Sequence, residues 1–278
     1  MDSQNLIVES PCKINLGLKV HNKRNDGFHN ISSIFIELNL VDSIEFRKSK
    51  NPIIEFKGAN VDTDNTVLKA LELVKKYYNI NFEHTITITK NIPIGAGLGG
   101  GSSNGASTLK SLNQLYNLNI SDRELMVLSK KIGSDVSFFI NGGIKKVTGR
   151  GDIIENVNYA DLGSKYYLLV MPSFSISTSW AYKKIKKHLH LLEINPKFPP
   201  LTGKVDWALF ENDFEQFVCS AYPEILDIKK IFYKSGALYS SLSGSGSTVF
   251  GIYNDMKSAL SARNCFDSFH TYIASPKI

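Results

Sequence analysis

The most informative stretch of the sequence is Pro93–Ser103, PIGAGLGGGSS, which holds five glycines within seven positions. It follows Thr85–Thr89, a Thr/Ile alternation that predicts a strand, and it leads into Asn104–Tyr116, whose apolar spacing predicts a helix. Glycines let backbone N–H groups approach a ligand closely, and the helix behind adds the positive end of its dipole. Since an ordinary flexible connection would avoid the entropic cost of so many glycines, this stretch predicts a phosphate-binding loop.

Two well-known phosphate loops can be tested against this stretch. Gly95, Gly97 and Gly100 match the spacing of the dinucleotide-binding fingerprint, but that fold requires a parallel strand after the helix. Here Ser121–Glu124 forms a capping box that opens a second helix, which excludes the fingerprint. A Walker A loop requires a lysine before Ser102, where Gly101 stands. Any lysine that reaches the phosphates must therefore come from elsewhere in the chain.

Regular elements are predicted outward from this loop in both directions. Residues 5–20 are strand-like, Asp26-Gly27 predicts a tight hairpin turn, and Ile31–Leu40 predicts the return strand. A helix is predicted for Thr63–Tyr78, capped by one of Asp62, Thr63 and Asp64. Further strands are predicted at Ile144–Thr148, Tyr166–Met171, Leu238–Leu242, Thr248–Tyr253 and Thr271–Ala274. Further helices are predicted at Thr178–Leu191, Trp207–Tyr222, Pro223–Lys234 and Asp255–Phe269.

This order of elements predicts an α+β protein, and the length supports two domains. The 278 residues are 42% hydrophobic and 11% aromatic, which excludes disorder and small disulfide-rich scaffolds. A typical domain holds about 150 residues, so two domains or one large one are expected. The least regular stretch, Glu155–Ser164, places the predicted boundary at about residue 160. We therefore predict domains 1–160 and 161–278, with a surface loop at Leu192–Lys204.

The charge balance favours anionic ligands without requiring nucleic acid. Lys and Arg number 32 against 26 Asp and Glu, a net charge of +6. The densest basic run, Lys183, Lys184, Lys186, Lys187, His188 and His190, is typical of a solvated helix face. A nucleic-acid-binding module remains a weaker alternative, because only Trp180 and Tyr182 lie near these lysines for stacking.

The cysteines and the distribution of apolar residues indicate in which cellular compartment the protein is expected. Cys12, Cys219 and Cys265 are scattered and never form a C-x-x-C pair, which argues against disulfides and a zinc site. The N-terminal residues carry acids and no basic segment before an apolar core, and no apolar stretch has the length of a bilayer span. We expect a cytoplasmic protein with no membrane contact.

Beyond these patterns, the chain resembles a known enzyme superfamily over almost its whole length. The glycine stretch is similar to the ATP-binding motif of the galactokinase, homoserine kinase, mevalonate kinase and phosphomevalonate kinase (GHMP kinase) superfamily. The motifs that carry the resemblance are Ser10–Leu18, Arg24–His29, Pro93–Ser103, Ile132–Phe139 and Leu242–Thr248. It implies an N-terminal domain like domain 2 of ribosomal protein S5, a ferredoxin-like C-terminal domain and an active site in the cleft between them.

The motifs resemble most closely the branch of the superfamily that phosphorylates a cytidine diphosphate ester, CDP-methylerythritol, on its 2-hydroxyl. The resemblance implies a place in non-mevalonate isoprenoid precursor synthesis, with ATP and Mg²⁺ as cofactors. At Phe28 the branch more often has Tyr. Loss of the hydroxyl keeps the stacking face and removes one polar contact.

The resemblance also implies the roles of particular residues. Lys13 and Asp135 match the catalytic pair, in which Asp135 is the base for the substrate hydroxyl. Lys13 alternates with Asn15 on one strand face, so both side chains can enter one cleft, where Lys13 keeps Asp135 ionised and offsets phosphoryl charge. As an alternative role, Asp135 is an N-cap for residues 136–140.

Ligand contacts are implied in the same way. The implied ATP-binding residues are Asn65, Pro93, Ile94, Gly95, Ala96, Gly97, Leu98, Gly99, Gly100, Gly101, Ser102 and Ser103. The implied substrate-binding residues are Asn15, Phe28, His29, Thr178 and Tyr182, where a helix cap is the alternative role of Thr178. Ser243–Thr248 either forms a second nest of backbone N–H groups, close to the substrate phosphates, or is only a tight connection to the next strand. No protein ligand of Mg²⁺ is predicted beyond a guess at Ser103.

Three other functions stay open on the sequence alone. A superfamily kinase for another small alcohol, such as homoserine or mevalonate, is opposed by the Phe28-His29 pair. A catalytically silent sensor would be expected to lack Lys13 or Asp135, and both are present. A nucleic-acid module would show a steep salt dependence of binding. We expect a monomer or a weak homodimer.

Overall fold

The computed structural model describes residues 5–157, 160–185 and 205–277. The residues of the basic run from Lys186 to His190, the end of the helix predicted to reach Leu191 and the loop predicted at Leu192–Lys204 lie outside the described residues. The described helices and two sheets confirm the α+β class. None of the described helices combines the length and hydrophobicity that a bilayer span requires. All three cysteines lie in the described part of the chain, and no disulfide joins them.

The chain folds into two compact units. Unit 1 comprises Met1–Cys12, Leu40–Ile94 and Gly99–Asn141, and unit 2 comprises Lys13–Asn39, Gly95–Leu98 and Gly142–Ile278. The glycine stretch is therefore divided, with Gly95–Leu98 in unit 2 and the residues from Gly99 onward in unit 1. The boundary at about residue 160 remains a prediction.

Two long strands pass through both units and form a hairpin. β1 (Leu6–Lys23) pairs with β2 (His29–Lys48), as the sequence predicted, although β2 extends well beyond Leu40. The connection is a wider loop than the predicted tight turn, because only Gly27, at φ +87°, has a positive φ. The backbone N–H of Arg24 donates to the carbonyl of Phe28 at 2.7 Å and closes this loop.

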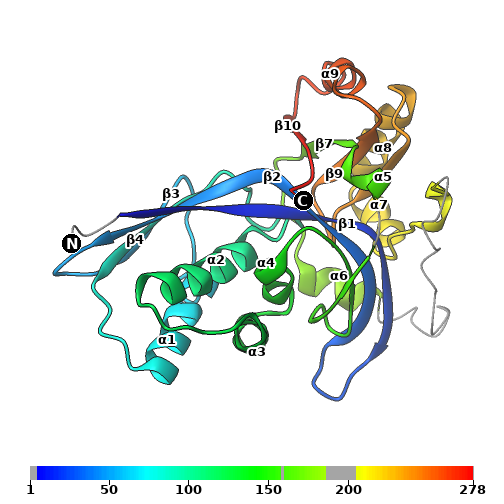
Figure 1. Cartoon of the computed structure of the whole chain (residues 1–278). Coiled ribbons are helices and arrows are strands. Elements are labelled where there is room, and N and C mark those ends of the chain that lie inside the picture. Colours follow the sequence, from blue (N-terminus) through cyan, green and yellow to red (C-terminus); the bar gives the residue numbers. More distant parts are fainter. Residues whose placement is uncertain (1–4, 158–159, 186–204, 278) are drawn as a thin grey trace. The chain divides into compact units, whose positions relative to one another are not determined.

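Unit 1 places helices against a sheet. β2 pairs antiparallel with β4 (His84–Thr89), which pairs parallel with β3 (Ile54–Lys57), a short strand that the sequence analysis missed. Figure 1 shows the helices of this unit on one side of these strands. The helices are α1 (Thr66–Tyr78), α2 (Gly100–Leu115), α3 (Asp122–Ile132), the 3₁₀ helix η1 (Ser134–Ser137) and α4 (Phe138–Asn141).

The starts of these helices follow from their capping residues. The side chain of Asn65 caps α1 by accepting from the N–H of Leu68 at 3.0 Å, so the prediction of Asp62, Thr63 or Asp64 as the cap was wrong. Helix α3 carries the predicted capping box at Ser121. Helix α2 begins at Gly100, four positions earlier than Asn104, because Gly99 at φ +70° already turns the chain into the helix.

In unit 2, strands of the first sheet continue and a second sheet forms. β2 pairs antiparallel with β5 (Ile144–Thr148), which pairs with β6 (Ile153–Asn156). Strand β6 is not predicted from the sequence, and its last two residues fall in the stretch predicted to be irregular, Glu155–Ser164. The second sheet has the order β10-β7-β9-β8 and is antiparallel throughout. Its strands are β7 (Tyr166–Met171), β8 (Tyr239–Leu242), β9 (Val249–Tyr253) and β10 (His270–Ala274), all close to the predicted ranges.

Two helices of unit 2, α8 (Pro223–Lys234) and α9 (Met256–Arg263), pack onto the second sheet. The unit also contains α5 (Ala160–Gly163), α6 (Thr178–Ile185) and α7 (Glu215–Ala221), which packs against α8. A Cβ atom at Gly251 of β9 would lie 2.3 Å from the ring of Phe232 in α8, so the close approach of helix and strand requires glycine there. Val170, Val249 and Phe232 belong to the buried core between the layers.

One long helix predicted for unit 2 is broken. The range Trp207–Tyr222 contains a short 3₁₀ helix, η3 (Trp207–Leu209), and then α7. The side chain of Asn212 accepts from the N–H of Phe214 at 3.0 Å and donates to two carbonyls of distant residues. These contacts hold the chain in a non-helical conformation that the apolar spacing did not reveal.

Candidate functional site

Lys13 lies in unit 2, in contact with Asn15 and Gly97. The side chains of Lys13 and Asn15 are only 4% and 2% exposed, although they lie on a strand where a lysine normally reaches solvent. Lys13 Nζ donates to Asn15 Oδ1 at 2.6 Å and to the carbonyl of Gly97 at 3.3 Å. It also lies 4.6 Å from the centre of the Phe35 ring. These contacts confirm that Lys13 and Asn15 share one strand face.

Asn15 is itself oriented by its neighbours. Its Nδ2 donates to Ser33 Oγ at 3.1 Å, and Ser33 Oγ donates to the carbonyl of Gly17 at 2.6 Å. Because the amide nitrogen is held in this way, the amide oxygen faces the Lys13 ammonium. The sequence analysis missed Ser33, since serines are common on strands and no spacing distinguishes this one.

Two glycine motifs that are far apart in the sequence meet in this cluster. Ser243 Oγ donates to the carbonyl of Gly97 at 2.9 Å, and the N–H of Thr248 donates to the carbonyl of Ala96 at 3.1 Å. The N–H of Lys13 donates to the carbonyl of Leu98 at 2.9 Å. Strand β1 and the loop that follows β8 thus fix the conformation of Gly95–Leu98.

The surroundings of Gly97 leave no room for a side chain in this conformation. Its φ is +78°, and a Cβ atom would lie 2.0 Å from the carbonyl oxygen of Ser243. We expect Gly97→Ala to lower the free energy of unfolding by more than about 4 kcal/mol, because backbone atoms cannot rotate out of such a clash. Gly236→Ala is the matched control, since Gly236 has φ +86° with nothing within 4 Å of its Cβ position. It should cost only about 1–2 kcal/mol for the left-handed conformation. Equal losses in urea denaturation would contradict this account.

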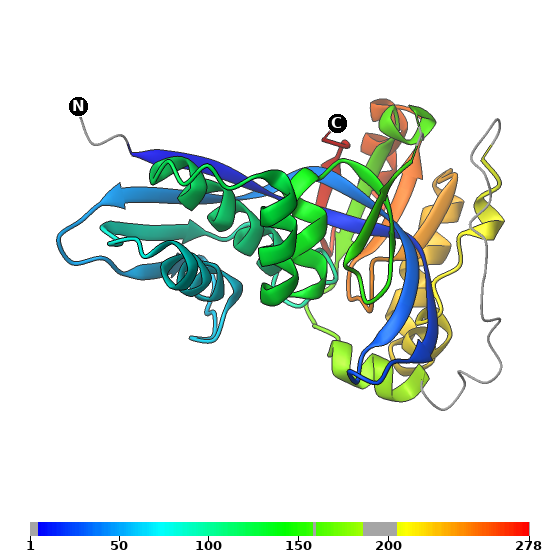
Figure 2. The same ribbon diagram turned by 60° about the horizontal axis from the view of Figure 1, so that its bottom comes forward.

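Three of the predicted substrate residues, His29, Tyr182 and Thr178, take part in two separate contacts in unit 2. The rings of His29 and Tyr182 are stacked, with centroids 5.2 Å apart and planes at 17°. Figure 2 shows α6, which carries Tyr182, beside the tip of the β1–β2 hairpin. Thr178 Oγ1 lies 3.0 Å from Ser245 Oγ in the loop after β8. The cap of α6 is Ser177, whose Oγ accepts from the N–H of Trp180, so the alternative role of Thr178 as a cap was wrong.

Phe28 takes a different position from that pair. Its ring is 48% exposed, and the guanidinium of Arg150 lies 5.2 Å from the ring centre. Arg150 also faces Asp152, with 3.7 Å between Nε and Oδ2. The aromatic face of Phe28 and a cation therefore lie next to each other at the surface of unit 2, an arrangement that stacking on a nucleobase can use. No pattern in the sequence singles out Arg150.

Asp135 lies in unit 1, inside η1. The N-cap of η1 is Gly133, so the alternative role of Asp135 as an N-cap was wrong. Asp135 is half-buried in the first turn of this helix, next to the buried Val136. Ser137 Oγ lies 2.9 Å from Ser129 Oγ and ties the short helix to α3. Asp135 is thus held on a well-anchored turn without serving as a cap.

The predicted ATP-binding residues of unit 1 surround the start of α2. Gly100–Ser103 form its first turn, and Thr66 Oγ1 donates to the carbonyl of Gly101, so the starts of α1 and α2 lie together. Asn65, the cap of α1, therefore lies next in sequence to a residue in contact with the glycine stretch. Ser103 is fully buried, and its Oγ accepts from Ser10 Oγ at 2.8 Å. Pro93 and Ile94 lead into the stretch as irregular chain.

A protein-built metal site is not evident near these residues. Over the described ranges 5–157, 160–185 and 205–277, no three His, Cys, Asp or Glu side chains gather closely enough to hold a metal ion. Magnesium commonly keeps water and substrate phosphates as ligands.

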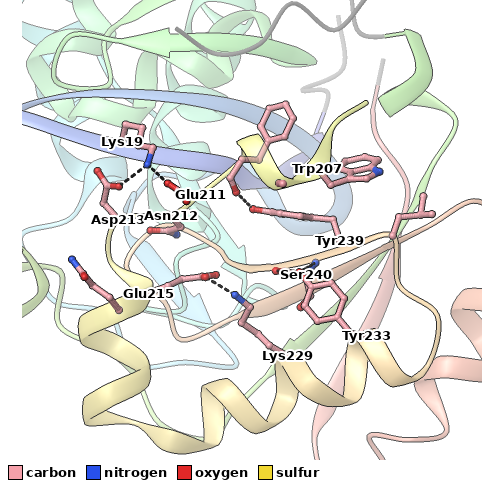
Figure 3. Close-up of a pocket in the computed structure, with 14 residues that line it drawn as sticks. Lys19, Trp207, Glu211, Asn212, Asp213, Glu215, Lys229, Tyr233, Tyr239 and Ser240 are labelled. Carbon is pink, nitrogen blue, oxygen red and sulfur yellow. Dashed lines mark hydrogen bonds and ion pairs between the residues drawn. The ribbon is translucent and has the colours of Figure 1, made fainter. Parts of the chain in front are cut away.

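Unit 2 also contains a pocket of about 620 Å³ beside the edge strand β8 (Figure 3). Lys19 Nζ lies 2.6 Å from Glu211 Oε2 and 3.1 Å from Asp213 Oδ1, and Lys229 forms an ion pair with Glu215. Burial lowers the pKa of Lys19, but its hydrogen bonds and the two carboxylates outweigh burial and raise that pKa above its ordinary value. Each of the two lysines of the pocket is thus paired with carboxylates that line the same pocket.

Side chains that line this pocket also form hydrogen bonds with the backbone of β8, the edge strand of the second sheet. The backbone of Ser240 exchanges hydrogen bonds of 3.3 Å with Tyr233 Oη, and the N–H of Leu242 donates to Glu215 Oε1 at 2.8 Å. Asn212 Nδ2 donates to the carbonyls of Leu242 and Gly244 at 2.8 Å and 2.9 Å. An edge strand closed in this way resists pairing with another chain, and the loop after β8 is anchored for its contact with Gly97.

Comparison with known proteins agrees with this architecture. The sequence model of the GHMP kinase N-terminal domain matches residues 65–143, and that of the GHMP kinase C-terminal domain matches residues 207–270. The fold and the glycine motifs therefore define a GHMP kinase. The chain is 40% identical to 4-diphosphocytidyl-2-C-methyl-D-erythritol kinase of Thermodesulfovibrio yellowstonii, with 93% of each chain covered. It is 37% identical to the kinase of that name from Pelodictyon phaeoclathratiforme, with 92% of each covered.

Within the GHMP kinases, the chain belongs to the family of 4-diphosphocytidyl-2-C-methyl-D-erythritol kinases. A crystal structure of 4-(cytidine 5'-diphospho)-2C-methyl-D-erythritol kinase shares the fold, with a TM-score of 0.79 and 24% identity. That comparison covers 97% of this chain and 98% of the other. The resemblance expected from the sequence motifs and the two-domain fold class are confirmed.

Proposed function

We propose that this protein transfers the γ-phosphoryl group of ATP to the 2-hydroxyl of 4-diphosphocytidyl-2-C-methyl-D-erythritol. The observation that carries the proposal is the 40% identity, over 93% of the chain, to a kinase of that name. The hydroxyl oxygen attacks the γ-phosphorus, the bond from that phosphorus to the β–γ bridging oxygen breaks, and ADP leaves. The hydroxyl proton passes to a base. This reaction forms the 2-phosphate in non-mevalonate isoprenoid precursor synthesis.

The Lys13 ammonium supplies positive charge for the transferred group in this proposal. Phosphoryl transfer depends mainly on positioning and on neutralising charge at the phosphoryl oxygens. Asn15 and the carbonyl of Gly97 orient the ammonium, and its burial strengthens its electrostatic effect. Lys13, which lies outside the glycine stretch, then supplies the positive charge that a lysine supplies in a Walker A loop.

The start of α2 holds the ATP phosphates in this proposal. The N–H groups of its first turn and the dipole of a helix that spans Gly100–Leu115 both favour negative charge. Mg²⁺ enters as part of the MgATP substrate, because the described residues offer no cluster of carboxylates for it.

Cytidine recognition is assigned to the tip of the β1–β2 hairpin and to α6. The stacked rings of His29 and Tyr182 combine a hydrogen-bonding edge with an aromatic surface, and Phe28 offers a second, half-exposed ring. An aromatic face binds any nucleobase, whereas an imidazole nitrogen can read the edge of the cytosine ring. Asp135 is assigned to the 2-hydroxyl as its base or positioning group. We place the reaction in the cytoplasm.

Turnover with matched acceptors tests the proposal. ADP release is measured with MgATP and CDP-methylerythritol, mevalonate or homoserine as the acceptor. We expect turnover only with the cytidyl substrate, because mevalonate and homoserine have no nucleobase that could bind at Phe28 and His29. Phosphorylation of mevalonate or homoserine instead would refute the substrate assignment, but the protein would still be a GHMP kinase. Binding of MgATP without phosphorylation of any of the three would refute the proposed reaction.

A further inference from the structure

A buried ion pair lies beneath the start of α2 in unit 1. The side chains of Lys90 and Asp42 are 5% and 0% exposed and form a direct ion pair. Asp42 Oδ1 also accepts from the backbone N–H groups of Asn91 and Ile92, at 2.8 Å and 2.9 Å. Charged residues are rarely buried so completely, and the catalytic assignments above do not use this pair.

The pair is connected to α2 through Asn104. Lys90 Nζ donates to Asn104 Oδ1 at 3.0 Å, and Asn104 Nδ2 donates to Asp42 Oδ2 at 3.0 Å. The same amide lies 2.9 Å from Ser10 Oγ, which donates to Ser103 Oγ. The residues that end the first turn of α2 are thereby hydrogen-bonded to β1, β2 and the chain after β4.

Gly100 shows how closely the helix start approaches this network. A Cβ atom at Gly100 would lie 2.9 Å from Ile92 Cγ2 and 3.3 Å from Lys90 Nζ. The first residue of α2 therefore rests directly on the segment that carries Lys90. A shift of that segment must also shift the N–H groups of the first turn.

We propose that Asp42, Lys90 and Asn104 are positioning residues that hold the first turn of α2 in the geometry needed to bind the ATP phosphates. This inference rests on the proposed function, because it assigns the start of α2 to ATP. None of the three is assigned a contact with the nucleotide, so they act through the helix. A buried ion pair is a poor means of adding stability, since apolar residues of similar volume often do as well or better. What it supplies is a single defined arrangement of hydrogen bonds.

The test separates positioning from stability with two variants of the full chain. Lys90→Met leaves Asp42 buried without its cation, so we expect the Tm to fall by several degrees. The Kd for MgATP, measured by calorimetry, should rise on the order of 10- to 100-fold, as for a misplaced binding group. The double variant Asp42→Asn/Lys90→Met leaves no buried charge and should recover much of the Tm. Its Kd should stay raised, because the ammonium that donates to Asn104 Oδ1 is still missing.

A lysine of unit 2 provides the matched control. Lys229→Met removes the cation from Glu215, another largely buried pair, and should lower the Tm without changing the Kd for MgATP. The KM for the alcohol substrate should stay near the wild-type value in the Lys90 variants. A Kd in Lys90→Met equal to wild type, or a Kd that recovers with the Tm in the double variant, would overturn the positioning role. A wild-type protein that binds MgATP but phosphorylates no acceptor refutes the proposed reaction alone, because the comparison of Kd values still stands.

Discussion

Lys13→Met is expected to lower kcat on the order of 100- to 1000-fold, the effect of removing one preorganised group that stabilises transition-state charge. Methionine keeps the length of the buried stem and its packing near Phe35, but it removes the ammonium beside the carbonyl of Gly97. The charge on the transferred phosphoryl group is then less well offset. Because the loss falls on the transition state, kcat should change more than the KM for ATP. Steady-state kinetics with CDP-methylerythritol measure both.

The control for this variant lies on the same strand. Lys19→Met also removes a lysine from β1, and Lys19 pairs with Glu211 and Asp213 in the pocket of Figure 3. It should cost some stability and leave kcat close to wild type. If the two variants lost kcat equally, the effect would come from β1 as a whole, and Lys13 would have no special role in the reaction.

Those parts of the fold that depend on local sequence signals were predicted correctly. The capping box at Ser121 and the proline at position 223 start α3 and α8 where predicted, because a cap acts within one turn of the chain. The alternation of Lys13 and Asn15 predicted their common face, since the period of a strand is two residues.

Features decided by distant contacts were missed or misplaced. The helix predicted from Trp207 breaks because Asn212 bonds to Leu242 and Gly244, about thirty positions later. Strand β3 was missed because it is four residues long and depends on pairing with β4. Local propensity contains no information about such partners.

The candidate site divides in the same way. The glycine stretch was recognised from composition, but its contact with Ser243 joins residues 146 positions apart. Lys90 and Asp42 gave no signal at all, because a lone lysine and a lone aspartate usually lie on the surface. Only the fold shows that the two form a buried ion pair, with Lys90 Nζ close to Gly100.

Asp135→Asn is expected to lower kcat on the order of 100- to 10,000-fold, the usual contribution of a general base. Asparagine keeps the size of the side chain and can still orient a hydroxyl, but it cannot take up the proton. Since Gly133 rather than Asp135 caps η1, the Tm should stay close to wild type. Calorimetry should also show unchanged MgATP binding, because the nucleotide is assigned to the start of α2.

A second variant at this position and a control elsewhere in unit 1 separate the two roles of the carboxylate. Asp135→Ala removes both proton transfer and orientation, so it should lose more activity than Asp135→Asn if orientation matters as well. Near-normal turnover by Asp135→Asn would show that the carboxylate only positions the hydroxyl, and that the proton leaves by another route. Asp122→Asn changes an exposed aspartate in the first turn of α3 and should cost only about 0.5 kcal/mol of helix stabilisation, with kcat unchanged. A loss of kcat in Asp122→Asn as large as that in Asp135→Asn would show that the effect comes from removing a carboxylate from unit 1 and not from the chemistry of Asp135.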